Sequence, residues 1–468
     1  MADAISEAIP SGALDPTAST ARPGARVRVG VVLAAGRSER LSGVTGGGSK
    51  ALVRVGGLAL VERAVRTLLA AGLERVVVVV GYQAGPVAAV VDRLAPGRVR
   101  AAFAERWEAG NGASLAAAEP LVGEEELFAL ITADHVFAED ALEPLFGVDR
   151  PAVLVDGAPE PAAWAEGTRV RLQAGRAVAF SKQLGDPSID CGAFVLPPAV
   201  FDAQRRAASR GDASLAGAVS ELAGATPLFA VSLPPGAWWQ DVDTPEDLRR
   251  VRHRLRRSLI KDADGPVSRY LNRPVSTRLS MALGPVPLHP DVVSVIACLV
   301  GVAGGWILGL GLGVLGAILV HASSVLDGVD GEVARLQVRT SAGGALLDGV
   351  LDRLADTAVL AGLAAWAIQA GWAPVPVAAV GVVATAGAML SMASKDRIAA
   401  LGIPPTPERR IGYLLGGRDA RLLFAALTGV AGRPLWGLIA IAATSALSLS
   451  VRLLLARSTL RGAWAGPR

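Results

Sequence analysis

The sequence predicts two domains in different solvents, an α/β domain in water followed by an all-α membrane domain of six transmembrane helices. The 468-residue chain is 51% hydrophobic and 19% charged, with a mean hydropathy of +0.43, which is too apolar for an average soluble protein. Charged residues have the spacing of a soluble domain up to Arg257, whereas apolar runs from Val292 onward approach the roughly 20 residues that cross a hydrocarbon core. A buried strand that enters a glycine turn indicates the α/β class of the first part.

Charge and cysteine content exclude several function classes. The formal charge is only +4 and no dense Lys/Arg tract with interleaved aromatic residues is present, so nucleic acid is not an expected partner. Cys191 and Cys298 are too few and too far apart for a zinc site, and they fit a reduced, cytosolic setting. Residues 1–25 lack a basic start followed by an apolar core, so we expect a disordered leader and no signal peptide.

The soluble domain, expected over residues 26–257, begins with a parallel βαβ unit. The stretch "VRVGVVLAAGRSERL" contains a buried strand, Val27 to Leu33, that ends in a glycine turn, and such a turn presents backbone N–H groups to phosphates. A helix from about Val61 to Ala71 and a second core strand, "RVVVVVGY", follow. This segment therefore predicts a phosphate-binding edge.

The same segment resembles the signature of the sugar-phosphate nucleotidyltransferases, which have a Rossmann-like fold. It departs from that signature at Ser38, where a second glycine is commoner, and the similarity continues through "AGNGASL", "LITADHVF" and "WWQDVDTPEDL". The resemblance implies catalytic roles for Arg40 and Lys50. The residues that it places at the nucleotide are Leu33, Ala35, Gly36, Lys50, Gly81, Asn111 and Ser114.

The resemblance also implies a Mg²⁺ ion, with Mn²⁺ as a substitute. In that family the metal is bound by an aspartate at the end of a central strand and by one in the last motif, which correspond here to Asp134 and Asp243, with Asp241 as second choice. The segment "DVDTPEDL" is also typical of a helix start, with Thr244 as the cap and Pro245 at the first position. Both interpretations can hold together.

Apolar runs divide the membrane domain, expected over residues 291–468. The six predicted spans are Val292 to Leu310, Gly311 to Leu326, Ala345 to Trp366, Val375 to Met392, Leu422 to Gly432 and Pro434 to Leu455. The fifth is short for a full crossing. Lys and Arg gather in alternate connections, so we expect a multi-pass protein of the cell's inner membrane whose basic loops face the cytoplasm.

Residues 258–290 are expected to form a linker and an amphipathic juxtamembrane helix. The segment "SRYLNRPVSTRLSMALGPVPLHPDVVS" precedes the first predicted span. Its Arg269, Arg273 and Arg278 fit that helix and equally fit contacts with lipid headgroups.

Four aspartates lie at the cytoplasmic ends of the second and third spans. Asp327 and Asp330 are three residues apart, and Asp348 and Asp352 four apart, so each pair projects from one helical face. Four carboxylates at the bilayer edge need a compensating cation or proton. Hard oxygen ligands of this kind suit Mg²⁺ or Mn²⁺, which would polarise a diphosphate. Solvated helix ends and a cation-transport site are the alternatives.

The full spacing around these aspartates resembles the signature of the CDP-alcohol phosphotransferases without departure. The residues that carry the match are Asp327, Asp330, Gly331, Ala334, Arg335, Gly344, Asp348 and Asp352. The resemblance implies that the four aspartates form the metal site, that Asp352 is also the general base, and that Gly331 and Arg335 lie at the nucleotide. Asp356 lies outside the signature and is expected to be an ordinary helix-end charge.

A domain that makes a nucleoside-diphosphate alcohol, fused to one that consumes a CDP-alcohol, narrows the nucleotide to CTP. This pairing resembles the bifunctional inositol-1-phosphate cytidylyltransferases and di-myo-inositol phosphate phosphate synthases. It implies formation of CDP-inositol from CTP and inositol 1-phosphate, followed by transfer of phosphoinositol to a second inositol 1-phosphate with release of CMP. The product would be a compatible-solute precursor. Both active sites should face the cytoplasm, and we expect a homodimer through the membrane domain.

Substrate contacts follow from the same resemblance. The stretches "FSKQL" and "SIDCGAF" place Lys182 at the inositol phosphate and Asp190 at ring hydroxyls, although a solvated loop charge and a turn residue remain alternatives. The acceptor phosphate calls for a basic pocket beside the aspartates, and these arginines also satisfy the positive-inside pattern. The candidates for that pocket are Arg409, Arg410, Arg418 and Arg421.

Three alternative functions remain open. The membrane domain could be a phospholipid synthase with a lipid donor or acceptor, beside a first domain of different specificity or regulatory role. A phosphocholine substrate is disfavoured because a choline pocket needs an aromatic cage and the chain is only 4% aromatic. A non-catalytic first domain is disfavoured because Arg40, Lys50, Asp134 and Asp243 are all present.

Overall fold

The chain forms two compact units in the computed structural model, which describes residues 27–37, 40–401 and 411–464. The first unit comprises Met1–Arg54 and Ala59–Val251, and the second comprises Val55–Leu58 and Arg252–Arg468. The expected leader, Ser38, Arg409 and Arg410 lie outside the described residues.

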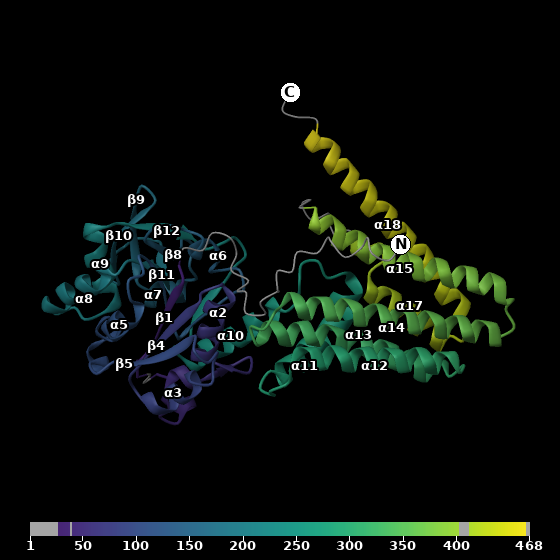
Figure 1. The fold of residues 1–468 in the computed structure, drawn as a ribbon, viewed down its shortest axis with the longest axis horizontal. Coiled ribbons are helices and arrows are strands. Elements are labelled where there is room, and N and C mark those ends of the chain that lie inside the picture. Colours follow the sequence, from purple (N-terminus) through teal and green to yellow (C-terminus); the bar gives the residue numbers. More distant parts are fainter. Residues whose placement is uncertain (1–26, 38–39, 402–410, 465–468) are drawn as a thin grey trace, which may run out of the picture. The chain divides into compact units, whose positions relative to one another are not determined.

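A nine-stranded mixed sheet forms the centre of the first unit (Figure 1). In spatial order its strands are β5 (Val99–Phe103), β4 (Arg75–Val80), β1 (Val29–Ala34), β6 (Phe128–Thr132), β11 (Ile189–Leu196), β8 (Ala152–Asp156), β12 (Leu228–Ser232), β10 (Arg176–Ser181) and β9 (Arg169–Gln173). The first four strands are parallel, and β11 runs antiparallel to both β6 and β8. The βαβ start that the sequence predicts is confirmed, with α2 (Leu60–Ala70) between β1 and β4.

Helices cover both faces of this sheet, which explains why its parallel strands are almost continuously apolar. One core joins alternate residues of β1, such as Val32 and Ala34, to α2, α3 (Ala84–Val91) and α6 (Glu143–Phe146). The opposite core joins the other residues of β1 to further helices. These are α4 (Asn111–Leu115), α5 (Glu119–Val122), α8 (Ala199–Ser209) and α9 (Leu215–Ala225).

Short elements complete this part of the chain. They are α1 (Ser42–Thr45), η1 (Lys50–Leu52), β2 (Arg54–Val55), β3 (Leu58–Ala59), η2 (Trp107–Ala109), η3 (Ala116–Ala118), β7 (His135–Phe137), α7 (Pro161–Glu166), β13 (Trp239–Asp241) and α10 (Pro245–Ser258). β7 and β13 form a separate antiparallel pair.

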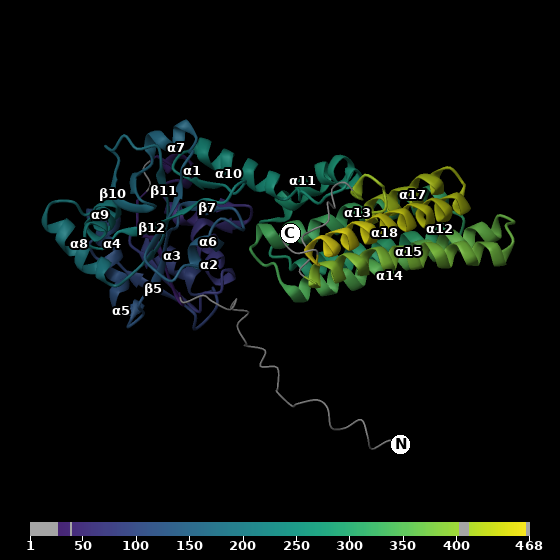
Figure 2. The same ribbon diagram turned by 90° about the horizontal axis from the view of Figure 1, so that it is seen from above.

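The second unit is a helical bundle (Figure 2). Its elements are η4 (Ser268–Asn272), α11 (Arg273–Leu283), α12 (Pro290–Gly309), α13 (Gly313–Leu336), α14 (Ala342–Gln369), α15 (Pro374–Ala400), α17 (Arg418–Val430) and α18 (Pro434–Trp464). The helix expected before the first span is present as η4 and α11.

Four of the described helices are long and apolar enough to cross a membrane, namely α12, α13, α15 and residues Pro434–Thr459 of α18. These four indicate a multi-pass membrane protein. The other two predicted spans differ from them. α14 has 28 residues but carries two aspartates and an arginine in its first half, and a third aspartate, Asp356, directly after them. α17 has only 13 residues, which at 1.5 Å per residue fall short of a hydrocarbon core of about 30 Å.

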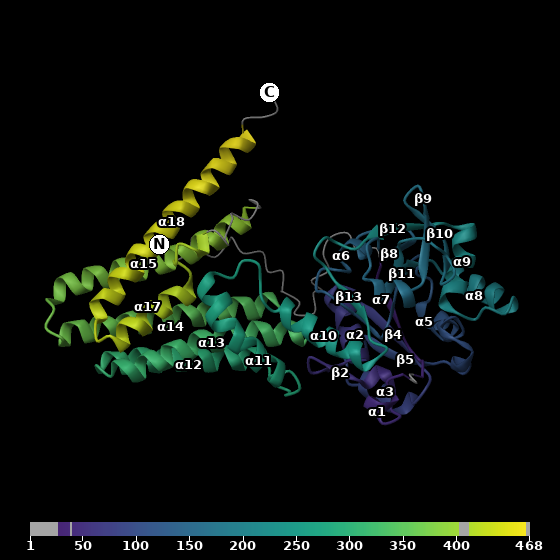
Figure 3. The ribbon, with the colours of Figure 1, turned by 180° about the vertical axis from the view of Figure 1, so that it is seen from behind.

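α12 and α14 approach closely because glycines face each other between them, and Figures 1 and 3 show the two helices side by side. A Cβ atom added at Gly362 would overlap the carbonyl oxygen of Gly305, and one added at Gly305 would overlap the backbone of Ala358. Small residues of this kind are typical of helix pairs in membranes, where packing drives association. The approach sets the position of α14, which carries Asp348 and Asp352.

We expect Gly362→Ala to destabilise the bundle by about 1–3 kcal/mol, because the added methyl group must push two backbones apart. The matched control is Gly343→Ala in the same helix, since no atom lies within 4 Å of a Cβ built there. Thermal unfolding of the purified protein in detergent measures both variants. Equal midpoints for the two variants would contradict the packing argument.

Two candidate active sites

The first cluster of charged side chains lies at the carboxyl ends of the central parallel strands, where α/β sheets bind ligands. Asp134 follows β6 and His135 begins β7. The pairing of β7 with β13 places Asp241 opposite His135. Asp243 lies between β13 and α10, whose first turn is capped as predicted, since Thr244 Oγ1 accepts a hydrogen bond from the Asp247 amide at 3.2 Å.

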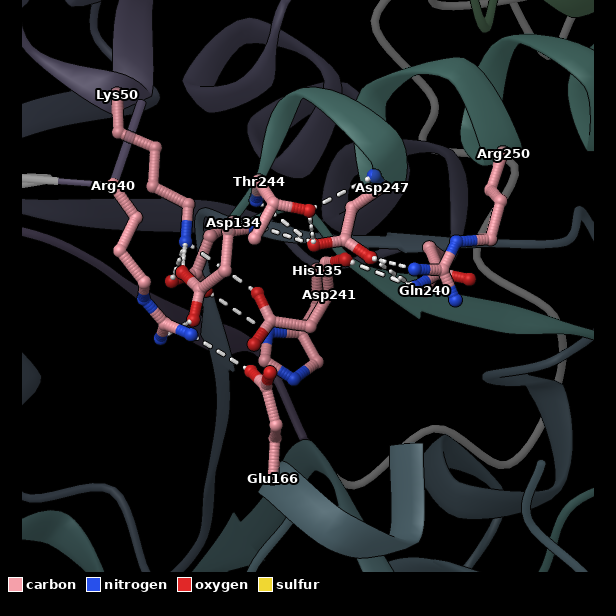
Figure 4. A network of polar contacts seen from close by, with 11 residues as sticks. Arg40, Lys50, Asp134, His135, Glu166, Gln240, Asp241, Thr244, Asp247 and Arg250 are labelled. Carbon is pink, nitrogen blue, oxygen red and sulfur yellow. Dashed lines mark hydrogen bonds and ion pairs between the residues drawn. The ribbon is translucent and has the colours of Figure 1, made fainter. Parts of the chain in front are cut away.

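Lys50 is the centre of this cluster (Figure 4). Its Nζ lies 2.8 Å from Asp134 Oδ2 and 3.4 Å from Asp241 Oδ1, and it also contacts the Asp243 carboxylate. Burial would lower the pKa of Lys50, but the three carboxylates outweigh burial and raise this pKa above its usual value. Lys50 in turn holds the pKa of Asp134 well below its usual range in spite of burial. The ammonium group therefore stays charged and neutralises part of the cluster.

Arg40 closes one side of the cluster. Its guanidinium contacts Asp243. Its Nη1 donates to Glu166 Oε2 at 2.8 Å (Figure 4). Glu166 is the last residue of α7 and is exposed, so this ion pair is screened by solvent. The structure thus brings the two predicted catalytic cations, Arg40 and Lys50, onto one carboxylate, Asp243.

Asp134, His135 and Asp241 form a group that could hold a metal ion. One ligand atom from each lies within 4.8 Å of the other two. The pKa of Asp241 rises to about 6 because of burial and the charge of Asp134. Asp243 does not belong to this group among the described residues, and its role as a metal ligand stays a prediction.

His135 is a functional candidate that the sequence reasoning missed, although it directly follows Asp134. Its Nδ1 lies 2.9 Å from Asp134 Oδ1 and 2.6 Å from Thr132 Oγ1. The ring stacks on Trp239, with ring centres 5.3 Å apart and an interplanar angle of 2°. Burial alone would lower the pKa of His135, but Asp241 and Asp134 outweigh it and raise the pKa to about 9.

The predicted nucleotide-binding residues lie around the glycine turn. A Cβ at Gly36 would meet only the side-chain oxygen of Asn111, at 4.0 Å, so these two residues face each other. Gly81 packs so tightly that a Cβ would lie 2.6 Å from Trp107 and 2.9 Å from Ala35. Leu33 and Ala35 are buried. Ser114 is also buried, and its hydroxyl donates to the Gly110 carbonyl at 3.2 Å.

The predicted substrate residues lie on different elements. Asp190 belongs to β11 rather than to a turn, at an irregularity in the pairing with β8, and accepts the Gly192 amide at 2.9 Å. Gly192 has a φ of +68°, and a Cβ there would lie 2.9 Å from the His135 ring. Burial raises the pKa of Asp190. Lys182 accepts a hydrogen bond at its backbone carbonyl from Arg169.

The second cluster lies in the helical unit. Asp327 on α13 and Asp348 and Asp352 on α14 bring one carboxylate oxygen each to within 4.8 Å of the others, which is a geometry that could hold a metal ion. Asp330, the fourth predicted ligand, lies on α13 like Asp327. It is 5% exposed and accepts a hydrogen bond from Ser294 Oγ on α12. Three of the four signature aspartates therefore converge most closely.

Arg418, the first residue of α17, inserts into this cluster. Its Nη1 lies 2.6 Å from Asp327 Oδ1 and 3.1 Å from Asp352 Oδ1, and its Nε donates to Asp356 Oδ1 at 3.0 Å. Arg421 Nη2 donates to the other oxygen of Asp356, also at 3.0 Å. Asp356 is only 3% exposed, so the expectation of an ordinary helix-end charge is wrong. Two arginines from a distant helix enclose it.

Other signature residues support the helix ends. Arg335 Nη2 donates to the Leu259 carbonyl at 3.1 Å. Gly331 has the Arg335 guanidinium as its nearest neighbour, 3.4 Å from where a Cβ would stand. Gly344 donates its amide to Ser341 Oγ at 3.0 Å, which caps α14.

The juxtamembrane arginines differ in their surroundings. Arg273 is buried between Asp264, at 2.9 Å, and Glu332, at 2.6 Å, so it is an internal ion pair rather than a headgroup contact. Arg269 donates to the Lys261 carbonyl, and Arg278 donates to the carbonyl of Pro274 while remaining exposed.

Comparison with known proteins identifies the class that these two sites define. Residues 30–181 match the MobA-like NTP transferase domain model, and residues 287–408 match the CDP-alcohol phosphatidyltransferase model. The chain is therefore a nucleotidyltransferase fused to a CDP-alcohol phosphotransferase.

Relatives with the same pair of domains narrow the class. The chain is 38% identical to a "Bifunctional IPC transferase and DIPP synthase" of Rubrobacter xylanophilus, over 86% of this chain and 90% of that protein. A protein of the same name from Aquifex aeolicus is 31% identical over 87% of this chain and 92% of its own length. The chain belongs to the family of bifunctional IPC transferases and DIPP synthases.

Among solved structures, the inositol-1-phosphate CTP transferase from T. maritima is similar to 49% of this chain and to 97% of its own chain, with 26% identity and a TM-score of 0.44.

The His135 environment predicts a pH dependence of local stability. A histidine whose folded pKa of about 9 exceeds its unfolded value of about 6.5 stabilises the fold fully below pH 6.5, and this contribution is lost as the pH rises through 9. We expect hydrogen-exchange protection of β7 and β13, corrected for intrinsic rates and measured in EDTA, to fall over this range by up to about 3 kcal/mol. In His135→Gln, the protection of β7 and β13 should change little with pH over the same range. Protection that rises with pH in the unmodified chain would refute the assignment.

Proposed function

We propose that the soluble domain makes CDP-inositol from CTP and inositol 1-phosphate, and that the membrane domain transfers phosphoinositol from CDP-inositol to a second inositol 1-phosphate. CMP leaves in the second step, and the product is di-myo-inositol phosphate phosphate. The observation that carries this proposal is the presence of both charged clusters in a chain that matches a bifunctional relative over 86% of its length.

In the first reaction, a phosphate oxygen of inositol 1-phosphate attacks the α-phosphorus of CTP, and the bond from that phosphorus to the pyrophosphate oxygen breaks. Lys50 and Arg40 supply the positive charge that stabilises the departing pyrophosphate. The raised pKa of Lys50 supports this role because it keeps the ammonium charged throughout the physiological range. The backbone of Gly36, which faces Asn111, is the proposed phosphate contact.

In the second reaction, a hydroxyl of the acceptor attacks the β-phosphorus of CDP-inositol, and the bond to the CMP oxygen breaks. Asp352 accepts the hydroxyl proton as the new bond forms. The arginines beside the cluster, Arg418 and Arg421, bind the acceptor phosphate, together with Arg409 and Arg410 of the basic connection. The position of Arg418 against Asp327 and Asp352 supports a phosphate site next to the reacting atoms.

Both clusters fit divalent cations of the Mg²⁺ and Mn²⁺ class. The aspartate triad offers hard carboxylate oxygens, and the soluble site adds an imidazole nitrogen from His135, a ligand that Mg²⁺ rarely uses. Asp327, Asp330, Asp348 and Asp352 would hold ions in the membrane domain, and Asp134 with Asp241 or Asp243 in the soluble domain. When bound, such ions polarise phosphoryl oxygens and stabilise the charge of the leaving group.

We propose six membrane crossings, with α14 and α17 added to the four apolar helices. The polar first half of α14 then lies at the cytoplasmic side, where its aspartates meet Arg418. The soluble domain spans residues 26–257, the linker and juxtamembrane helix 258–290, and the membrane domain 291–468. The protein lies in the inner membrane of the cell, and both active sites face the cytoplasm. The homodimer through the membrane domain stays a prediction.

The proposed orientation can be tested at the two ends of α15, which is one candidate span. Trp372 and Leu401 flank this helix and are 50% and 60% exposed. In a chain whose two buried cysteines are replaced by alanine, we expect Trp372→Cys to react with an impermeant maleimide added to intact cells, and Leu401→Cys to react only after permeabilisation. Reaction of both from the same side would overturn the model.

The two reactions can be separated by single substitutions. We expect Asp134→Asn to lower CDP-inositol formation by about a hundredfold or more, while supplied CDP-inositol is still consumed. Asp352→Asn should lower transfer by about 10²–10⁴-fold, so CDP-inositol should accumulate from CTP and labelled inositol 1-phosphate. Chromatography of the labelled products measures both steps.

The control variant is Asp396→Asn, which removes an exposed carboxylate, 70% accessible, from α15 and should leave both steps unchanged. A normal yield of the final phosphodiester from Asp352→Asn would refute the transfer site. A product formed only when a lipid donor or acceptor is added would favour the phospholipid synthase alternative.

A further inference from the structure

Arg418 contacts two of the residues that are proposed to bind metal. Its Nη1 touches Asp327 and Asp352, at 2.6 Å and 3.1 Å, and these are two of the three carboxylates whose oxygens converge. The Arg418 side chain is only 11% exposed. A positive charge from the protein itself therefore stands against the candidate metal ligands in a largely buried place.

Such a charge and a divalent cation exclude each other. An ion bound at about 2.1 Å from the same carboxylates would lie within a few ångströms of the guanidinium, because the ion-pair contacts of Nη1 with these carboxylates are only 2.6 and 3.1 Å long. Water screens little in a buried site, so like charges at this separation repel strongly. Arginine does not lose its proton in proteins, so the conflict is relieved only by movement of the guanidinium.

Asp356 provides an anchor for that movement. It holds Arg418 through Nε, on the opposite edge of the guanidinium from the contact with Asp327. Its second oxygen is fixed by Arg421 Nη2, and Arg421 Nη1 in turn donates to the Gly416 carbonyl at 2.9 Å. Asp356 can therefore keep its contact with Arg418 while Nη1 changes partner.

We propose that Arg418 and a divalent cation are alternative partners of Asp327 and Asp352, and that Asp356 is a positioning residue that keeps Arg418 beside the cluster when the cation replaces it. The N–H groups of Arg418 that the cation displaces then face the phosphate of the acceptor. The proposal rests on the proposed metal site of the membrane domain. It assigns Asp356, which lies outside the signature, a role in coupling metal binding to phosphate binding.

The test measures binding of Mn²⁺ alone, by electron paramagnetic resonance of the free ion, to the full chain in detergent. All variants carry Asp134→Asn and Asp241→Asn, so that the soluble site contributes equally little. Arg418→Gln should tighten Mn²⁺ binding about tenfold, since a competing charge is removed. Asp356→Asn should weaken it about tenfold, because Arg418 then loses its other carboxylate and holds Asp327 and Asp352 more strongly.

The double variant Asp356→Asn with Arg418→Gln provides the decisive comparison. It should bind Mn²⁺ as tightly as Arg418→Gln alone, because Asp356 acts on the metal only through Arg418. This result also excludes misfolding as the cause of weak binding in Asp356→Asn. Unchanged or weaker binding in Arg418→Gln, or a double variant as weak as Asp356→Asn, would overturn the proposal.

Two controls separate this proposal from the function that it rests on. Arg353→Gln removes the same charge next to Asp352 in sequence, but Arg353 pairs with Asp396 at 3.3 Å instead, so Mn²⁺ binding should change by less than about threefold. Asp327→Asn with Asp352→Asn should abolish the binding that the variants share. If it does not, the metal site itself is refuted. If it does and Arg418→Gln has no effect, only the coupling is refuted.

Discussion

Both sites depend on a cation of the protein that holds clustered carboxylates together. Carboxylates within 4.8 Å of one another repel and would otherwise take up protons or move apart. In the soluble site Lys50 contacts Asp134, Asp241 and Asp243. In the membrane site Arg418 contacts Asp327, Asp352 and Asp356. The fold therefore stabilises an arrangement of like charges before any ligand contributes to it.

Two packing constraints in the rest of the bundle position the aspartates of the membrane site. Glu332, which lies two residues after Asp330 on α13, is fully buried and accepts from Arg273, Ser276 and Ser280 of α11. A buried charge with these partners fixes the rotation of α13, because losing one partner would leave the charge uncompensated. The glycine contact between α12 and α14 sets the distance from the other side. Asp327 and Asp352 meet because both constraints hold.

Local patterns in the sequence predict much of this arrangement, and long-range pairing explains what they miss. The strand β1, the helix α2 and the strand β4 follow from apolar runs and a glycine turn, and the shared faces of the aspartate pairs follow from helical spacing. The role of Asp356 depends on Arg418, 62 residues away, and no periodicity encodes that pairing. Local patterns do not predict a role for His135 for the same reason, since its contacts with Asp241 and Trp239 arise when β13 pairs with β7. The short α17 is a further example. A count of its apolar residues does not reveal that its first residue, Arg418, contacts Asp327 and Asp352.

The two sites use different cations, and the chemistry of each cation suits its place. Lysine is a compact, strongly hydrated charge on a flexible stem, and Lys50 lies in a soluble domain where its ammonium can turn among three oxygens. Arginine has a planar fork that contacts several carboxylates along separate edges, as Arg418 does through Nη1 and Nε. A fork can keep one edge bound while the other changes partner, which a single ammonium cannot do with the same geometry. Replacement of Arg418 by lysine would therefore preserve the charge of the membrane site but remove the separate contact with Asp356, on which the proposed exchange between carboxylate and phosphate depends.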